Sequence, residues 1–133
     1  MVSTGVPLSH LIKENMGVKL DEFNSYREKM NKRLLEAENN KIIKRIFSID
    51  TLSYEDGALD ARTKEMLGLV ASMVLRCDDC IKYHLITCYK LGVTEDELME
   101  VIGIANLVGG TIVIPHTRRA IEFWDDLSKN TTE

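Results

Sequence analysis

Proline is scarce in this chain of 133 residues: there are two, Pro7 and Pro115, so residues 8–114 contain none. Proline breaks a helix because it lacks a backbone N–H and its ring clashes with the preceding turn. Aromatic residues make up only 6% of the sequence, and the regularly spaced turn residues of a β-sandwich are missing. These absences predict an all-α fold.

The sequence also lacks a long apolar run and an excess of basic charge. Its longest apolar stretches, residues 66–75 and 101–115, are shorter than the roughly 20 residues that a membrane-spanning helix needs. Lys and Arg number 17 against 21 Asp and Glu, a net charge of −4, and they are scattered. A phosphate backbone is bound by clustered basic side chains, so we expect neither a nucleic-acid partner nor a membrane.

The beginning of the chain does not resemble a secretory signal, because no basic residue precedes its short apolar segment. We therefore expect a cytoplasmic protein whose three cysteines are reduced by default. The length is typical of one domain, and neither a repeat nor a linker is visible. We predict a single domain over residues 1–133, with an N-terminal segment at 1–19 and a disordered tail at 128–133.

Hydrophobic periodicity and capping residues predict where the helices lie. Apolar residues recur every three or four positions over 20–34 and again over 42–47, and residues 53–57 are typical of a loop. Asp60 is a suitable N-cap for a helix through residue 75. A further helix over 80–91 ends at Gly92, the next begins with a capping box of Thr94 and Glu97 and ends near residues 109–110, and the last bends around Pro115 and runs to residue 127.

Two cysteines and a histidine form the motif with the clearest chemical potential. Cys77 and Cys80 are three residues apart, and His84 follows Cys80 by four, which places it on the same helix face. A thiolate is the reactive form of cysteine, and it is favoured by a helix N-terminus, a nearby histidine or a Cys-x-x-Cys pair. Such a pair can also close a disulfide, so that one thiol attacks and the other resolves.

Structural interpretations compete with this redox hypothesis. The two cysteines can be small core residues, or they can bind zinc together with His84, although no fourth ligand is evident. His84 alone can be a buried core histidine. Glu65, twelve residues before Cys77, either turns inward to orient His84 or is a solvated residue in the first turn of its helix; the residues leave these two interpretations equal.

The complete pattern consists of Glu65, eleven residues, Cys77-Asp78-Asp79-Cys80, three residues and His84. It resembles the signature of the carboxymuconolactone decarboxylase and alkylhydroperoxidase D superfamily, and residues of about 58–127, the expected core, are similar to its small single-domain members. The resemblance implies an all-helical fold built around an antiparallel helical hairpin, assembled as homotrimers or homohexamers.

The resemblance also implies an activity, that of an alkylhydroperoxidase-type, peroxiredoxin-like oxidoreductase. It makes Glu65, Cys77, Cys80 and His84 the catalytic relay and implies a hydroperoxide or disulfide substrate and a dithiol or thioredoxin-like reductant, with no cofactor and no metal. In alkylhydroperoxidase D the residue before the second cysteine is a relay histidine. Here it is Asp79, which leaves room for a general disulfide oxidoreductase.

The remaining assignments follow from spacing. Cys80 is favoured as the attacking thiol because His84 can activate it, with Cys77 resolving. Cys88 is expected in the core, His116 in the same pocket or an interface, and His10 on the surface. Two other functions stay open: a lyase or isomerase acting on a small lactone acid with His84 or His116 as base, and a noncatalytic helical assembly protein.

Overall fold

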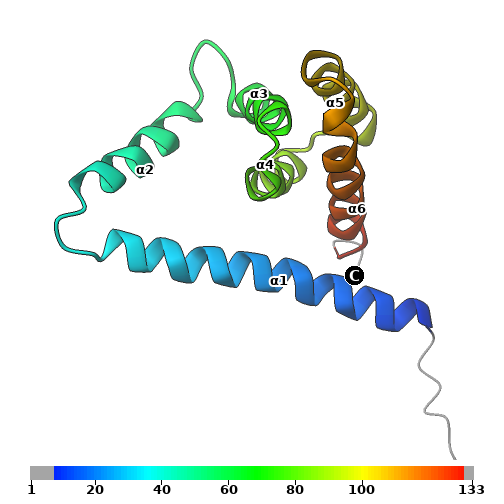
Figure 1. Ribbon diagram of the computed structural model, residues 1–133, viewed down its shortest axis with the longest axis horizontal. Helices are drawn as coiled ribbons and strands as arrows, with labels where there is room; N and C mark the ends of the chain where they lie inside the picture. The colour runs from blue at the N-terminus through cyan, green and yellow to red at the C-terminus, as the bar shows by residue number, and fades with distance from the viewer. Residues whose placement is uncertain (1–7, 131–133) are drawn as a thin grey trace, which may run out of the picture. The chain divides into compact units, whose positions relative to one another are not determined.

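The computed structural model describes residues 8–130, with side chains from residue 19 onward, and in this part of the chain it contains helices and no strand (Figure 1). The predicted all-α class is therefore confirmed. The elements are α1 (Leu8–Leu35), α2 (Lys41–Ser53), α3 (Ala61–Val74), α4 (Asp78–Lys90), α5 (Glu95–Gly109), the short 3₁₀ helix η1 (Thr111–Val113) and α6 (Ile114–Asn130).

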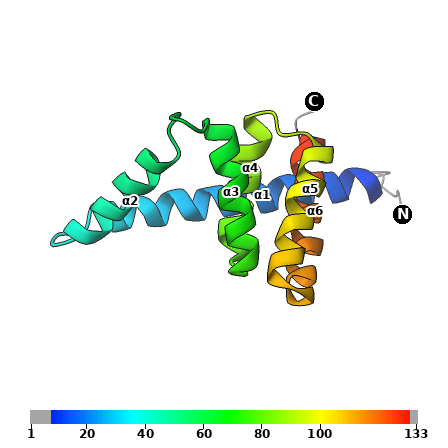
Figure 2. The same ribbon diagram turned by 90° about the horizontal axis from the view of Figure 1, so that it is seen from above.

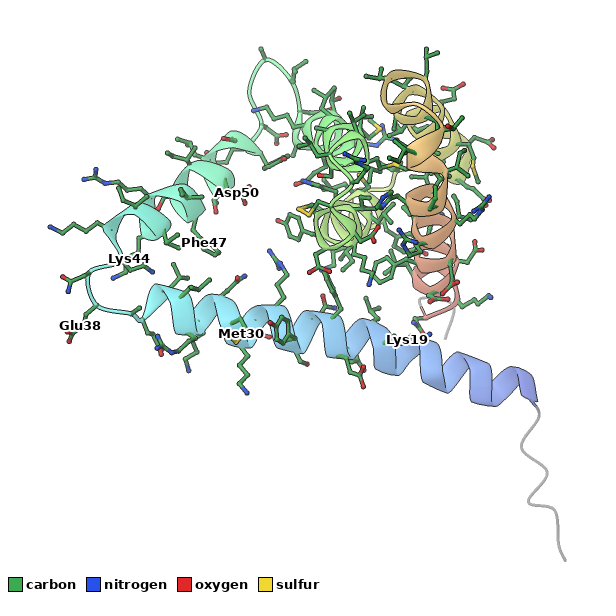
Figure 3. The ribbon with its side chains drawn as sticks, in the orientation of Figure 1. Lys19, Met30, Glu38, Lys44, Phe47 and Asp50 are labelled. Carbon is green, nitrogen blue, oxygen red and sulfur yellow. A yellow bond between two sulfur atoms is a disulfide. The ribbon has the colours of Figure 1, made fainter. Side chains whose placement is uncertain are left out.

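The chain divides into two compact units. One contains α1 and most of α2 together with the last residues of α6, and the other comprises residues 50–125. Within the first unit, Figure 3 shows Glu38 in the turn between α1, which carries Met30, and α2, which carries Phe47. In this turn the Asn40 side chain donates a hydrogen bond to the carbonyl of Leu34.

Helices α3 and α4 pack side by side in the second unit (Figure 2), joined by residues 75–77. The short connection makes them the antiparallel hairpin that the resemblance implied. Asp60 caps α3 as predicted, because its carboxylate accepts the backbone N–H of Thr63 at 2.7 Å. The connection is tight: Arg76 has a φ of +60°, and the Cys77 N–H bonds back to the Ser72 carbonyl.

Helix α4 begins at Asp78, two residues before the predicted start. The reason is that Cys77 is its N-cap, with the sulfur accepting the Cys80 N–H at 3.3 Å. Gly92 follows the helix with a φ of +80°, a left-handed conformation that glycine adopts without strain. The predicted glycine stop is therefore confirmed.

The capping box at the start of α5 is present as predicted, with the Thr94 and Glu97 side chains each bonded to the other's backbone N–H. Helix α6 starts beside Pro115 and continues to Asn130. The predicted disordered tail therefore starts too early: residues 128–130 are helical because the last helix continues past residue 127, while residues 131–133 lie outside the described part of the chain. The expected N-terminal segment includes residues 1–7, which also lie outside it.

The core of the second unit is formed by apolar side chains from α3 to α6 that are almost inaccessible to solvent: Leu69, Met73, Ile81, Leu85, Leu98, Ala105, Val113 and Ala120. These residues fix how α3 and α4 face each other and therefore where the polar residues between them lie. None of the helices within residues 8–130 is long and apolar enough to cross a membrane.

An ion pair between Arg62 and Glu97 joins the start of α3 to the start of α5. The hydrogen bond from Arg62, followed by those from Thr94, lowers the pKa of Glu97 from 4.5 to about 2. A lowered carboxyl pKa contributes stability that is present above the unfolded-state pKa and is lost as the pH falls toward the folded-state value. We expect Glu97→Gln to lower the melting temperature at pH 7 and to flatten its dependence on pH between 4.5 and 2, as measured by circular dichroism.

Glu95→Gln is the matched control, since it removes the same charge from the first turn of α5. Its melting temperature is expected to follow that of the unsubstituted protein across the same pH range. If Glu97→Gln and the unsubstituted protein lost stability in parallel below pH 4.5, the ion pair would have no part in acid sensitivity.

Candidate active site

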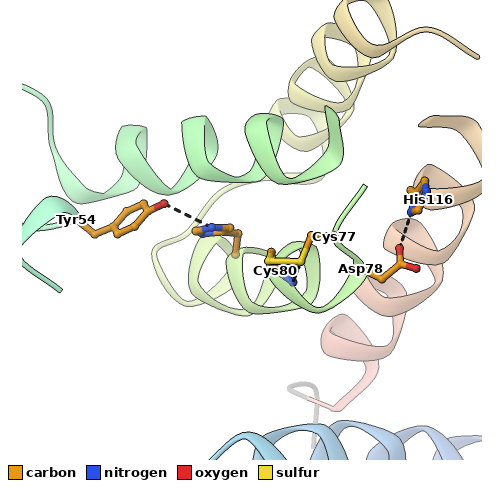
Figure 4. The surroundings of a disulfide bond; sticks show 6 residues. Tyr54, Cys77, Asp78, Cys80 and His116 are labelled. Atoms are coloured by element: carbon orange, nitrogen blue, oxygen red, sulfur yellow. Dashed lines mark hydrogen bonds and ion pairs between the residues drawn. A yellow bond between two sulfur atoms is a disulfide. The ribbon is translucent and has the colours of Figure 1, made fainter. Parts of the chain in front are cut away.

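The two cysteines of the motif are joined as a disulfide at the start of α4 (Figure 4). Their Cα atoms lie 5.2 Å apart. Cys77 is half-buried and Cys80 is exposed, so Cys80 is the more accessible residue of the pair. The interpretation of this pair as two ordinary core residues does not fit its exposure.

Glu65 turns inward and contacts His84, which settles the choice that the sequence left open. The Nδ1 atom of His84 lies 2.7 Å from Oε2 of Glu65, and the two residues are only 7% and 3% exposed. A carboxylate can only accept a hydrogen bond, so Nδ1 carries the hydrogen and donates it. This bond spans the α3–α4 hairpin and fixes the imidazole one helical turn after Cys80.

Tyr54 also contacts His84, and the sequence analysis assigned it no role. Its hydroxyl lies 3.5 Å from Nε2 of His84, and the two ring centroids are 5.4 Å apart. Burial, with the nearby charge of Glu65, raises the pKa of Tyr54 above 10, so the hydroxyl keeps its hydrogen at neutral pH and can donate it. The sequence signal was an aromatic residue inside the otherwise polar loop at 53–57.

Gly68 is the second residue that the sequence analysis missed, and it provides the space for this contact. A Cβ atom at this position would lie 2.6 Å from the Tyr54 hydroxyl and 2.7 Å from Cε1 of His84. Gly68 follows Glu65 by three residues on α3, so both face α4. A glycine in a helix interior is unfavourable by itself, and this was the signal available in the sequence.

A second polar cluster lies at the first residue of α4. The Asp78 carboxylate contacts Nδ1 of His116 at 2.8 Å and Nε of Arg119 at 3.1 Å, and Figure 4 shows His116 on α6 facing Asp78. Burial alone would raise the pKa of Asp78, but the hydrogen bond from His116 and the charge of Arg119 lower it below 3.8. His116, which was expected in the same pocket or in an interface, thus contacts the residue after Cys77.

The other candidate residues occupy different environments. Cys88 is completely buried, in agreement with the prediction, and burial together with the charge of Glu65 raises its pKa to about 12. Asp79 is exposed. The side chain of His10 lies outside the described residues. In the part of the chain with described side chains, no group of three or more His, Cys, Asp or Glu residues is arranged to hold a metal ion.

Residues 42–123 match the Carboxymuconolactone decarboxylase family. This interval contains α3, α4 and α5 and every residue of the candidate site from Tyr54 to Arg119. The chain therefore belongs to the carboxymuconolactone decarboxylase family, as the motif suggested.

Solved structures from the same family share the fold. The chain is similar to TM1620 of Thermotoga maritima, with 46% identity and a TM-score of 0.76 over 81% of this chain and 91% of that one. TM1620 is described as a family protein with a suggested involvement in the antioxidative response. The apo form of lpg0406 from Legionella pneumophila, also a family protein, has 26% identity and a TM-score of 0.75 over 83% of this chain and 97% of that one.

A curated relative is "Uncharacterized protein 4 in cox locus" of Paracoccus denitrificans. It is 28% identical over 80 residues, which represent 60% of this chain and 72% of the relative.

Substituting Gly68 tests how tightly the imidazole is held. We expect Gly68→Ala to lower the free energy of unfolding by about 1–3 kcal/mol, because the added methyl group overpacks the space between α3 and His84. The measurement is urea unfolding followed by circular dichroism. In the double variant with Tyr54→Phe the loss should be smaller, because the Tyr54 hydroxyl, the nearest of the atoms that the methyl group meets, is removed.

Gly103→Ala is the matched control, since Gly103 lies in the interior of α5 and a Cβ there meets nothing within 4 Å. It should leave stability unchanged or raise it by up to about 1 kcal/mol. Equal effects of the two substitutions would mean that Gly68 is not required for the approach of His84.

Proposed function

We propose that this protein is a thiol-dependent redox enzyme that reduces hydroperoxides or disulfides by cycling Cys77 and Cys80 between dithiol and disulfide. The observation that carries the proposal is a Cys77–Cys80 disulfide with an exposed Cys80, one helical turn before an imidazole that Glu65 holds in a buried site. The suggested antioxidative role of TM1620 supports the same class of reaction.

The Glu65–His84 pair supplies a proton acceptor for the thiol. Because Glu65 takes the Nδ1 hydrogen, Nε2 is the ring nitrogen that can receive the Cys80 proton, directly or through one water. The Tyr54 hydroxyl is 3.5 Å from Nε2, a long contact that can be exchanged for a contact with the thiol. The negative charge of Glu65 then stabilises the imidazolium that forms.

Oxidation of the dithiol proceeds in two steps when the substrate is a hydroperoxide. The Cys80 thiolate attacks the terminal peroxide oxygen, the O–O bond breaks, and an alcohol leaves with a proton returned through His84. Cys80 is then a sulfenic acid. Cys77 attacks its sulfur, a hydroxide leaves as water with the proton of the Cys77 thiol, and the disulfide closes.

Reduction of the disulfide returns two electrons and two protons from a dithiol or a thioredoxin-like protein. Cys80 is the more exposed residue of the pair, so we expect the incoming thiolate to attack its sulfur, with Cys77 as the leaving group. The Cys80 N–H bonded to the Cys77 sulfur at 3.3 Å and the N-terminus of α4 stabilise a thiolate at this position. A reducing compartment such as the cytoplasm would provide such a reductant.

The assay is consumption of an alkyl hydroperoxide, or of an aromatic model disulfide, by the purified protein with dithiothreitol. We expect Cys80→Ser to reduce turnover to the background rate and His84→Gln to lower it about 100-fold or more, the usual contribution of a positioned acid or base. Cys88→Ala should retain turnover because this thiol is buried and protonated.

Cysteine variants also separate this proposal from the lyase or isomerase alternative. Undiminished hydroperoxide and disulfide turnover in Cys80→Ser would overturn the redox proposal. Conversion of a lactone acid by a variant that lacks both Cys77 and Cys80 would instead favour the alternative, with His84 as the base.

We also propose that the protein is a homo-oligomer, a trimer or hexamer as the family resemblance implied. Large apolar side chains are exposed at the end of α5 and in η1, among them Leu107, whose relative exposure is 83%. The exposed apolar residues of this region are Ile104, Leu107, Val108 and Ile112, and those of α2 are Ile42, Ile46, Ile49 and Leu52. Contiguous apolar patches of this kind mark interfaces in soluble proteins.

Light scattering tests the assembly. At micromolar concentration we expect a mass of three or six chains, and we expect Leu107→Glu to yield smaller species because it places a charge in the patch. Lys90→Glu, which introduces the same side chain at an exposed position of α4, should keep the assembly intact. A monomer of the unsubstituted protein at this concentration would contradict the proposal.

A further inference from the structure

Asp78 holds an unusual position, since it is both the first residue of α4 and the direct neighbour of Cys77. Its two carboxylate oxygens point to different partners on α6: Oδ1 lies 2.8 Å from Nδ1 of His116, and Oδ2 lies 3.1 Å from Nε of Arg119. The proposed thiol cycle uses Glu65 and His84 and makes no use of this cluster. The side chain of His116 is nevertheless only 16% exposed.

A carboxylate next to Cys77 affects the charge state of that cysteine. A negative charge nearby disfavours a thiolate, whereas a positive charge or a hydrogen bond that draws the carboxylate away relieves the repulsion. In this structure the Asp78 carboxylate is bonded to α6, so its effect on Cys77 depends on residues that are 38 and 41 positions away in the sequence.

Other charged groups lie near Cys77 in the sequence or on the helices around it. Arg76 precedes Cys77, and Asp79 and Lys82 lie on the first turns of α4. His84 lies on α4 itself, seven residues after Cys77, and is bonded to Glu65 of α3. Arg118 is exposed on α6 without a contact to Asp78. The Asp78 carboxylate is bonded instead to His116 and Arg119.

We propose that His116 is a positioning residue that holds the Asp78 carboxylate away from Cys77, and thereby stabilises the Cys77 thiolate and makes the Cys77–Cys80 disulfide easier to reduce. The inference rests on the proposed function in one respect, the redox cycling of this pair. Reduction adds two electrons and leaves Cys77 as a thiolate after a proton has been taken up at Cys80. A more stable thiolate shifts the exchange with an external thiol toward the reduced protein.

The experiment compares His116→Leu with Arg118→Leu in the full chain. The reduced proteins are alkylated with iodoacetamide from pH 5 to 9, with mass spectrometry to follow Cys77, and the disulfide is equilibrated with glutathione buffers. For His116→Leu we expect alkylation of Cys77 at pH 6.5 to slow by about threefold to tenfold, because less thiolate is present. The glutathione equilibrium should shift toward the disulfide by a similar factor.

Arg118→Leu removes a cation from the same helix without touching Asp78 and should change neither quantity by more than twofold. His116→Gln restores a hydrogen-bond donor and should recover part of the effect. Asp78→Asn is the independent variant: it should speed alkylation of Cys77 at pH 6.5, and adding His116→Leu to it should have no further effect, because the two residues act through one contact.

Cys77 profiles and glutathione equilibria that are the same in His116→Leu, Asp78→Asn and the unsubstituted protein would overturn the inference, whatever happens to the melting temperature. Neither measurement uses a peroxide or turnover. If the unsubstituted protein failed to turn over any hydroperoxide or disulfide while His116→Leu still shifted the Cys77 profile, the proposed function would fail and the role of His116 would stand. If the unsubstituted protein turned over a hydroperoxide or disulfide while His116→Leu left the Cys77 profile unshifted, the proposed function would stand and the role of His116 would fail.

Discussion

The hydrogen bond between Glu65 and His84 is the contact on which the candidate site depends. It lies in the interior of the α3–α4 hairpin, at 2.7 Å, where leaving one buried hydrogen-bonding group without its partner costs about 1–3 kcal/mol. Its geometry in turn requires Gly68, because a side chain there would occupy the place of the imidazole. The packing of α3 against α4 therefore also fixes the orientation of the His84 ring.

The start of α4 adds a second constraint, on the sulfur atoms. Cys77 takes the place of the usual Asp, Ser or Thr as N-cap, so opening the disulfide leaves a sulfur that still faces a backbone N–H. Two carboxylate–histidine pairs involve this helix: Glu65 of α3 pairs with His84 of α4, and Asp78 of α4 pairs with His116 of α6. The two pairs differ in exposure: the first is buried, whereas Asp78 is partly accessible and open to the solvent around the sulfurs.

Local sequence signals were sufficient for much of the fold. The N-cap at Asp60, the capping box of Thr94 and Glu97 and the glycine stop at Gly92 each depend on residues within one turn of the helix end, and all three are confirmed. The i, i+4 relation of Cys80 and His84 is equally local. By contrast, the contacts Tyr54–His84 and Asp78–His116 join residues 30 and 38 positions apart, and no periodicity within a helix indicates which distant side chains will meet.

Asp79 shows why a motif alone does not define the chemistry of such a site. At this position alkylhydroperoxidase D has a relay histidine, and its replacement by Asp79 left room for a general disulfide oxidoreductase. In the structure Asp79 is exposed, and an imidazole reaches the first turn of α4 from α6, bonded to the adjacent Asp78. The residue next to Cys77 is therefore bonded to side chains of α6 that the motif does not include. A comparison restricted to residues 77–84 would count one histidine, whereas two imidazoles make contacts at this helix, His84 with Glu65 and His116 with Asp78.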